Sequence, residues 1–227
     1  MRLMALLQAA AGDAETLKTW LLHEFAPAQA PRDGAGAGRL IVNVATPPPE
    51  GLSLYGSSEA NAGAHYDAVL EASFDAPAQV RDWMEAVRRD APVGLAVCHG
   101  YAVRTRTVLH RPGFEPSRPT PGFKLLRGLY LHDDLPDAAA DRCWQHHEAL
   151  AVKVHVGLAR YARHWVIERL DGEAPAVRGF SDLHFPDEEA LRHRYFDSER
   201  GRDEILHDIG HFIRGGLQRV FAREYVY

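Results

Sequence analysis

The chain has 227 residues, of which 46% are hydrophobic and 25% charged, the composition of an ordinary globular protein with one or two domains. No apolar run approaches the roughly 18 residues of a membrane span, and the net charge of −5 without a basic block argues against a nucleic acid partner. The two cysteines, Cys98 and Cys143, fit neither a disulfide framework nor zinc-ligand spacing, so we expect a cytoplasmic protein.

Residues 1–110 predict the element order strand, helix, strand, strand, helix, strand. Hydrophobic periodicity and turn signals place these elements at about 2–8, 14–28, 39–45, 66–74, 77–91 and 100–109. Segment 111–122 then contains four prolines, which deny both helical and ladder hydrogen bonding. We interpret 111–122 as a linker between two domains.

Residues 123–227 predict the same order of elements. They are expected at about 124–132, 137–155, 160–169, 177–185, 187–214 with a break near Gly201, and 218–226. Pro136 marks a helix start, and Asp171-Gly172 marks a turn between strands.

A repeated segment supports two related halves. Trp20 to Glu24 and Trp144 to Glu148 both read W-x-x-H-E and lie 124 residues apart, and the same offset superimposes strands that precede and follow them. We therefore predict an α+β fold, in which residues 1–110 form a degenerate ferredoxin-like βαββαβ repeat and 123–227 a second one. Each four-stranded sheet leaves one face uncovered, so the two faces should pack into a pseudo-dimeric α/β barrel within one chain. The protein should then be a monomer, or a homodimer through another surface.

His147 is the leading catalytic candidate. At 100° per residue it falls at the centre of an apolar stripe of helix 137–155, beside Trp144, whereas Asp141 and Glu148 fall on the opposite face. Burial of an imidazole is costly without a partner and favours the neutral ring, which suits a general acid or base. The competing interpretation is a structural histidine bonded to a carbonyl or carboxylate. His23, its counterpart in the first half, faces a competing stripe and is the weaker candidate.

Other polar residues complete the candidate site. Tyr130 and Tyr161 could supply phenols near the helix, and Asp208 could orient a neighbouring imidazole or cap a helix. Strand alternation places Asp182 and His184 between the two sheets, together with Arg178 and Glu71, where a structural polar network is the alternative to a substrate-binding role. His207 and His211 have metal-ligand spacing, but the apolar face of their helix directs both to solvent, so we predict no metal site.

The second half resembles the EthD family of the dimeric α/β barrel (ferredoxin-like) superfamily. The resemblance is carried by Trp144 to Leu150, by Gly157 to Tyr161, by Phe180 to Phe185 before an acidic helix start, and by Asp208 to Phe212. It implies the barrel fold and a pocket near the helix of His147. Related barrels include isomerases, polyketide cyclases, dehydratases, monooxygenases and haem proteins.

The predicted function is that of a small-molecule enzyme of isomerase, cyclase or lyase type acting on an apolar or aromatic carbonyl compound. His147 would be the acid/base, and the substrate-binding candidates are Trp144, Tyr130, Tyr161, Asp182, His184 and Asp208. The alternative is a non-catalytic ligand-binding or degradation-accessory protein with the same pocket. No cofactor motif is present, although one buried histidine would suffice as a haem ligand.

Overall fold

The computed structural model describes residues 1–29, 38–54, 57–58 and 66–227. The elements of the first half are β1 (Arg2–Ala9), α1 (Ala14–Trp20), the π-helix η1 (Leu21–Phe25), α2 (Ala26–Gln29), β2 (Gly38–Ala45), β3 (Ser53–Leu54), β4 (Ser57–Ser58), β5 (Ala68–Ser73), α3 (Pro77–Asp90) and β6 (Leu95–His110). Segment 111–122 has no helix or strand.

The elements of the second half follow the same order. They are β7 (Phe123–Leu131), α4 (Asp137–Val154), β8 (Arg160–Arg169), β9 (Gly179–Phe185), α5 (Glu188–His193), α6 (Glu199–Ile209), β10 (Ile213–Gly216) and β11 (Val220–Val226). The expected positions of the strands and of helix 137–155 agree with these bounds to within a few residues, except that β6 starts five residues earlier than expected.

Eight antiparallel strands close into a barrel in the order β7-β11-β2-β5-β1-β6-β8-β9, with β9 pairing back to β7. Within residues 1–110 the neighbours run β2-β5-β1-β6, and within 123–227 they run β8-β9-β7-β11. If the four strands of each half are numbered by their order in the chain, the strands lie side by side in the order second, third, first, fourth in both halves. The halves join edge to edge through β6 with β8 and β11 with β2, so that each of the described barrel strands is paired on both sides.

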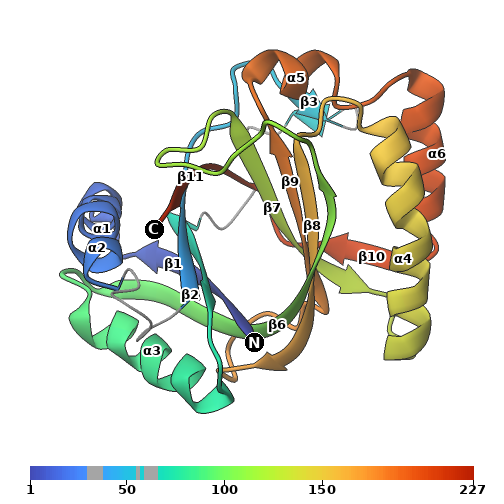
Figure 1. Cartoon of the computed structure of the whole chain (residues 1–227). Coiled ribbons are helices and arrows are strands. Elements are labelled where there is room, and N and C mark those ends of the chain that lie inside the picture. Colours follow the sequence, from blue (N-terminus) through green and yellow to red (C-terminus); the bar gives the residue numbers. More distant parts are fainter. Residues whose placement is uncertain (30–37, 55–56, 59–65) are drawn as a thin grey trace.

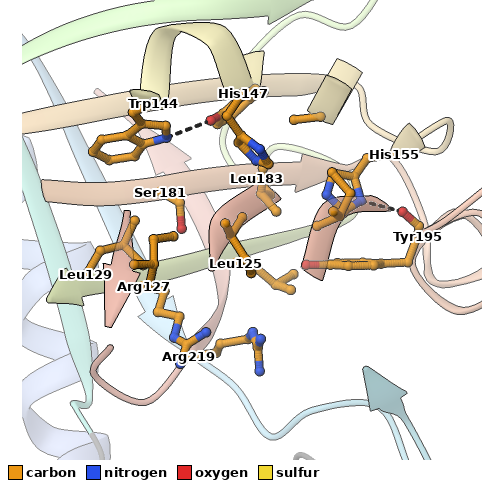
Figure 2. A pocket seen from close by; sticks show the side chains of 15 residues that line it. Leu125, Arg127, Leu129, Trp144, His147, His155, Ser181, Leu183, Tyr195 and Arg219 are labelled. Carbon is orange, nitrogen blue, oxygen red and sulfur yellow. Dashed lines mark hydrogen bonds between the residues drawn. The ribbon is translucent and has the colours of Figure 1, made fainter. Parts of the chain in front are cut away.

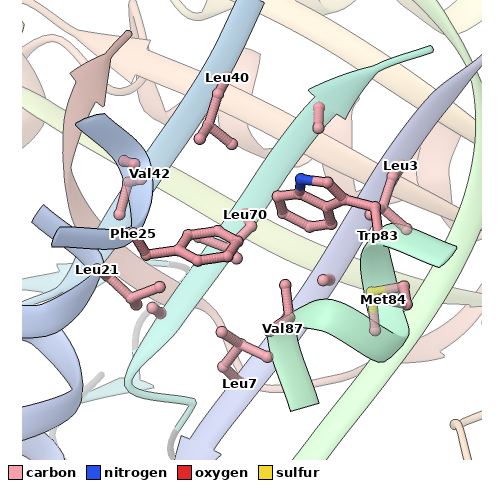
Figure 3. Close-up of a cluster of buried hydrophobic side chains, with 14 of the residues drawn as sticks. Leu3, Leu7, Leu21, Phe25, Leu40, Val42, Leu70, Trp83, Met84 and Val87 are labelled. Carbon is pink, nitrogen blue, oxygen red and sulfur yellow. The ribbon is translucent and has the colours of Figure 1, made fainter. Parts of the chain in front are cut away.

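Helices cover the outside of the barrel, as predicted. Figure 1 shows α1, α2 and α3 on one side and α4 with α6 on the opposite side. Alternation along β1 and β5 sends Leu3, Leu7 and Leu70 outward to meet α1 and α3, where they form the main apolar core of the first half (Figure 3). Phe25 and Trp83 pack edge to face across this core with ring centroids 5.3 Å apart.

The helical segment expected over 187–214 with a break near Gly201 is divided at a different place. Two helices, α5 and α6, are separated at residues 194–198, and Gly201 lies inside α6. The side chains of Asp187 and Ser198 accept hydrogen bonds from the backbone of the first turns of α5 and α6, so each is an N-cap that starts a new helix. After α6, the chain becomes β10, which pairs with β7 beside β11.

No helix within the described ranges is both long enough and apolar enough to cross a membrane.

Candidate functional site

A pocket lies between the outer face of the second-half sheet and helices α4 and α6 (Figure 2). Its cavity volume is about 70 Å³, within about 630 Å³ of empty space that is partly open to solvent. Its wall is mainly apolar, and the polar lining residues are Arg127, His147, His155, Tyr161, Ser181, Tyr195 and Arg219. Pockets of this kind, apolar with a few convergent polar groups, are typical of small-molecule sites.

His147 lies where the apolar stripe predicts it, on the inner face of α4 beside Trp144, and only 7% of its surface is exposed. Its Nδ1 is 2.6 Å from Oδ2 of Asp208 on α6. Because a carboxylate accepts, Nδ1–H donates, and the neutral ring then keeps its lone pair on Nε2. Burial lowers the pKa of His147, although the hydrogen bond to Asp208 opposes this. The ring is therefore a neutral base, oriented by a carboxylate, at the wall of a pocket.

Trp144 and Tyr161 form the part of the pocket wall next to His147. The indole Nε1 of Trp144 donates to the hydroxyl of Tyr161 at 3.1 Å, which joins α4 to β8. The indole lies so close to β9 that a Cβ at Gly179 would be 2.3 Å from Trp144. Glycine at 179 is thus required for the helix to approach the sheet at this point.

The sequence reasoning missed a second pocket histidine. His155 follows the last residue of α4, is 3% exposed, and its Nδ1 donates to the carbonyl oxygen of Tyr195. Burial lowers its pKa to about 4. It lies eight residues after His147, on the same helical face, and that spacing is the signal that could have identified it.

Arg127, Ser181 and Arg219 were also missed. Arg127 lies two residues from both Leu125 and Leu129 and therefore shares their face of β7. Ser181 likewise shares a face of β9 with Leu183. Both of these faces line the pocket. Arg219 lies in the irregular connection between β10 and β11, where periodicity carries no information.

Three of the expected substrate-binding residues lie elsewhere. Asp182 and His184 point to the barrel interior, the face opposite the pocket, and Tyr130 packs among interior apolar side chains. The alternation of β7 and β9 separates them from His147 by the thickness of the sheet. Of the expected set, the structure brings together Trp144, His147, Tyr161 and Asp208. Arg178, expected in the interior, instead binds Asp137 and the backbone near the start of α4.

The barrel interior holds a charged network centred on Lys124, which is fully buried. Its ammonium contacts Glu71, Asp182 at 3.0 Å and Glu224 at 3.0 Å. Arg160 also binds Glu224. Burial raises the pKa of the Glu71 and Glu224 carboxyls, but the neighbouring cations outweigh it and hold both pKa values at about 2. The alternative offered by the sequence, a structural polar network, describes Asp182 and His184 better than a substrate-binding role.

The interior network also contains the group of potential metal ligands found among the described residues, namely Glu71, His164 and Asp182. Lys124 already places its ammonium against two of these three residues. The cation that neutralises the cluster is therefore a side chain of the protein itself. His207 and His211 are exposed, as expected, with their Nε2 atoms 3.4 Å apart.

Glu148 departs from the expected solvent-facing position. It is 7% exposed and binds Arg163 at 2.6 Å and Arg106 at 3.0 Å. Asp141 likewise binds Arg163, so this side of α4 is attached to β6 and β8 by ion pairs. The helical projection of α4 could not anticipate the arginines of β6 and β8.

Comparisons with known proteins identify a fold. No family model matches the sequence, and no curated protein matches it. The chain is similar to a solved structure described as an anthrone oxidase-like protein, with a TM-score of 0.63 and 11% identity over 100% of this chain and 90% of that one. It is also similar to a mutant chlorite dismutase from Candidatus Nitrospira defluvii, with a TM-score of 0.56 and 8% identity over 98% and 90% of the two chains.

This chain shares the fold of both structures, and in this chain that fold is a closed antiparallel barrel. The expected barrel fold is thus confirmed. Identities of 8 to 11% carry no further information about the site.

Proposed function

We propose that this protein is a small-molecule enzyme that removes a proton from a carbon next to a carbonyl group, with Nε2 of His147 as the base. The observation that carries the proposal is the orientation of the ring. Asp208 fixes the proton on Nδ1, so that the unprotonated nitrogen belongs to the other edge of a ring that lines an apolar pocket. Proton transfer by a positioned side chain of this kind contributes about 10²- to 10⁴-fold to a rate.

Asp208 also stabilises the protonated form of His147 that such a reaction produces. When Nε2 accepts a proton the ring becomes an imidazolium, and the carboxylate 2.6 Å from Nδ1 stabilises that charge. Burial opposes the same charge, since it lowers the pKa of His147. The proton is therefore held weakly and is readily returned to the substrate.

The product of proton removal is an enolate, and its oxygen requires a hydrogen-bond donor. The Tyr161 hydroxyl and the Arg127 guanidinium are pocket-lining groups that can donate. Return of the proton to another atom gives an isomerase, loss of a leaving group gives a lyase, and attack of the enolate carbon on a second carbonyl gives a cyclase.

The anthrone oxidase-like protein supports this chemistry. An anthrone has a methylene group acidified through its ring by a carbonyl, so removal of a proton from that carbon gives the same kind of enolate. The two proteins share a fold, and this chain has a base in a pocket of that fold. An aromatic or otherwise apolar carbonyl compound is the substrate class that suits the apolar wall.

We further propose an EthD-like origin for the second half and a tandem arrangement of two ferredoxin-like repeats, 1–110 and 123–227, joined by the 111–122 linker. The identical strand order in the two halves supports the tandem arrangement. Because β6–β8 and β11–β2 complete the barrel within one chain, the protein would be a monomer or a homodimer through another surface. We also propose that the protein is cytoplasmic.

Deuterium exchange tests the proposed function without knowledge of the final product. Anthrone, aromatic lactones and short polyketide mimics are incubated with the protein in D₂O under nitrogen, and deuterium incorporation at the carbon acidified by the carbonyl is followed by NMR. At least one compound should exchange faster with the protein, and His147→Gln should abolish the acceleration. His146→Gln is the matched control, because His146 is the adjacent residue of α4 and is exposed.

Equal exchange with the His147→Gln variant would contradict the assignment of the base. Binding of these compounds without any exchange would favour the alternative function, a non-catalytic ligand-binding protein.

A further inference from the structure

We propose that His207 and His211 form a surface site for a divalent transition metal ion of the Zn²⁺ type, which links the end of α6 to the turn that follows it. The Nε2 atoms of the two rings lie 3.4 Å apart, and this juxtaposition carries the proposal. Exposure of both rings argues against an enclosed metal centre, but a surface site requires it. The site is separate from the pocket of His147, so metal binding does not depend on the proposed function.

The distance between the two nitrogens fits a shared metal ion. Zn²⁺ binds imidazole nitrogen at about 2.0 to 2.1 Å with tetrahedral angles, which places two such nitrogens about 3.3 to 3.4 Å apart. The observed 3.4 Å is long for a direct hydrogen bond, because good donor–acceptor distances end at about 3.2 Å. The rings are also nearly perpendicular, with an interplanar angle of 85°. A common metal ion therefore explains the placement of the rings better than their own hydrogen bond does.

The backbone holds the two rings in position. His207 belongs to the last turn of α6, and His211 lies just beyond the end of this helix. Phe212 is buried, and its carbonyl oxygen accepts a hydrogen bond from the backbone N–H of His132 at 3.0 Å. Nε2 of His132 donates to the carbonyl oxygen of Gly210, also at 3.0 Å. Because the backbone is fixed on both sides of His211, little conformational freedom is lost when its ring binds a metal ion.

The two side chains supply ligands of the right chemistry. A divalent transition metal binds the lone pair of an imidazole nitrogen, and the single proton of each ring then lies on Nδ1. Both side chains are exposed, so a hydrated ion can reach them without burial of its charge. Among the residues that the structure describes, no third histidine, cysteine or carboxylate joins this pair. Water would complete the coordination, as it does at zinc sites with an open position.

The position of the site gives the metal a structural effect. Asp208 lies between the two ligands in the chain, and its carboxylate binds His147 of α4. Helix ends open more readily than helix centres, and a metal that joins His207 to His211 restrains the last turn of α6 together with the turn after it. The ion would therefore hold Asp208 in place. Only the consequence of this restraint for catalysis rests on the proposed function.

Calorimetric titration of the full chain, after dialysis against a chelator, tests the site. Zn²⁺ should occupy one tight site per chain, whereas Mg²⁺, which prefers oxygen ligands, should not bind there. His207→Gln and His211→Gln should each weaken Zn²⁺ binding by at least about tenfold, because either change removes the chelate. His193→Gln is the matched control, since His193 is an exposed histidine at the end of α5, and it should keep the original affinity.

Two further measurements use the unaltered chain. In long-range ¹H–¹⁵N NMR spectra of histidine-labelled protein, Zn²⁺ should shift the Nε2 signals of His207 and His211 most strongly. Backbone hydrogen exchange over residues 205–213 should become slower when Zn²⁺ is added. The same slowing should occur in His193→Gln and be absent from His207→Gln and His211→Gln.

Absence of Zn²⁺ binding, undiminished binding in both glutamine variants at 207 and 211, or NMR shifts confined to other histidines would overturn the proposal. Hydrogen exchange over 205–213 that is equal with and without Zn²⁺ would contradict the restraint of this turn. Failure of every carbonyl compound to exchange deuterium would refute the proposed function and leave the metal site standing, because the titration measures metal binding alone.

Discussion

His23 and His147 occupy the same position of the two W-x-x-H-E segments, yet His147 lies in a pocket and His23 is exposed. The buried stripe of the first-half helix accounts for the difference, because Leu17, Leu21 and Phe25 face the sheet and His23 lies off this stripe. The chain passes through a π-helix at Leu21–Phe25, whereas α4 is α-helical over Asp137–Val154. In the first half, Phe25 and Trp83 fill the space between helices and sheet.

The exposure of His23 predicts that His23→Ala changes the free energy of unfolding by no more than about 0.5 kcal/mol, whereas His147→Ala costs about 1 to 3 kcal/mol. Urea denaturation measures both. A comparable loss in the two variants would show that His23 has a packing role that its exposure does not reveal.

Asp208→Asn should lower deuterium exchange by up to about 10⁴-fold, the loss that the same change causes in the Ser-His-Asp triad, where it leaves the ring in the wrong tautomer. The same change should lower the pKa of His147 further, because the hydrogen bond and charge of Asp208 raise it. NMR titration of the ring measures the pKa. Asp203→Asn, on the same helix, is the control, and an unchanged His147 pKa in Asp208→Asn would refute the pairing.

Gly179→Ala should displace Trp144. The added Cβ would be 2.3 Å from the indole, so either the ring or β9 must move, at a cost of about 1 to 3 kcal/mol. Loss of the hydrogen bond to Tyr161 should accompany the shift and change the tryptophan fluorescence. Gly172→Ala serves as the matched variant, since nothing lies within 4 Å of its Cβ position, and it should leave stability and spectrum unaltered.

Lys124→Met should destabilise the fold by about 3 to 5 kcal/mol, because it leaves Glu71, Asp182 and Glu224 buried without their shared cation. The double variant Lys124→Met/Glu71→Gln should be more stable than Lys124→Met alone. Denaturant unfolding of the single and double variants gives this comparison. A double variant no better than the single one would mean that the network is not held by charge.

Stability should fall as the pH decreases from about 6.5 to 4. Burial lowers the pKa values of His155 and His184 to about 4, whereas both rings titrate near 6.5 in the unfolded chain. In this window the unfolded state binds more protons, so each histidine contributes about 3 kcal/mol above pH 6.5 that is lost as the pH reaches 4. Below pH 4.5, protonation of Glu71 and Glu224 should continue the loss.

Denaturation at pH 7.0, 5.5 and 4.5 measures this dependence. His155→Gln and His184→Gln should each flatten it. A slope between pH 7.0 and 4.5 that is unaffected by both substitutions would show that neither ring is held neutral in the folded state.

The sequence alone determined the strands and helices of the barrel and the position of His147. Alternation along strands and the apolar stripe of helix 137–155 are local consequences of backbone geometry, and they require no knowledge of neighbours. The same rule put Ser181 and Leu183 on one face of β9 and Asp182 and His184 on the other. A pocket near the helix of His147 requires the face of Ser181 and Leu183, because the more apolar face of the strand packs under the helices, yet the expected substrate-binding set also included Asp182 and His184 from the other face.

Only the tertiary structure decided which partner each polar residue binds. Asp208 binds His147 from a position 61 residues further along the chain. Lys124 binds carboxylates of three different strands. These contacts depend on how the elements pack. Local periodicity fixes the direction of a side chain from its own element, but the partner across the gap is set by packing between elements distant in the chain.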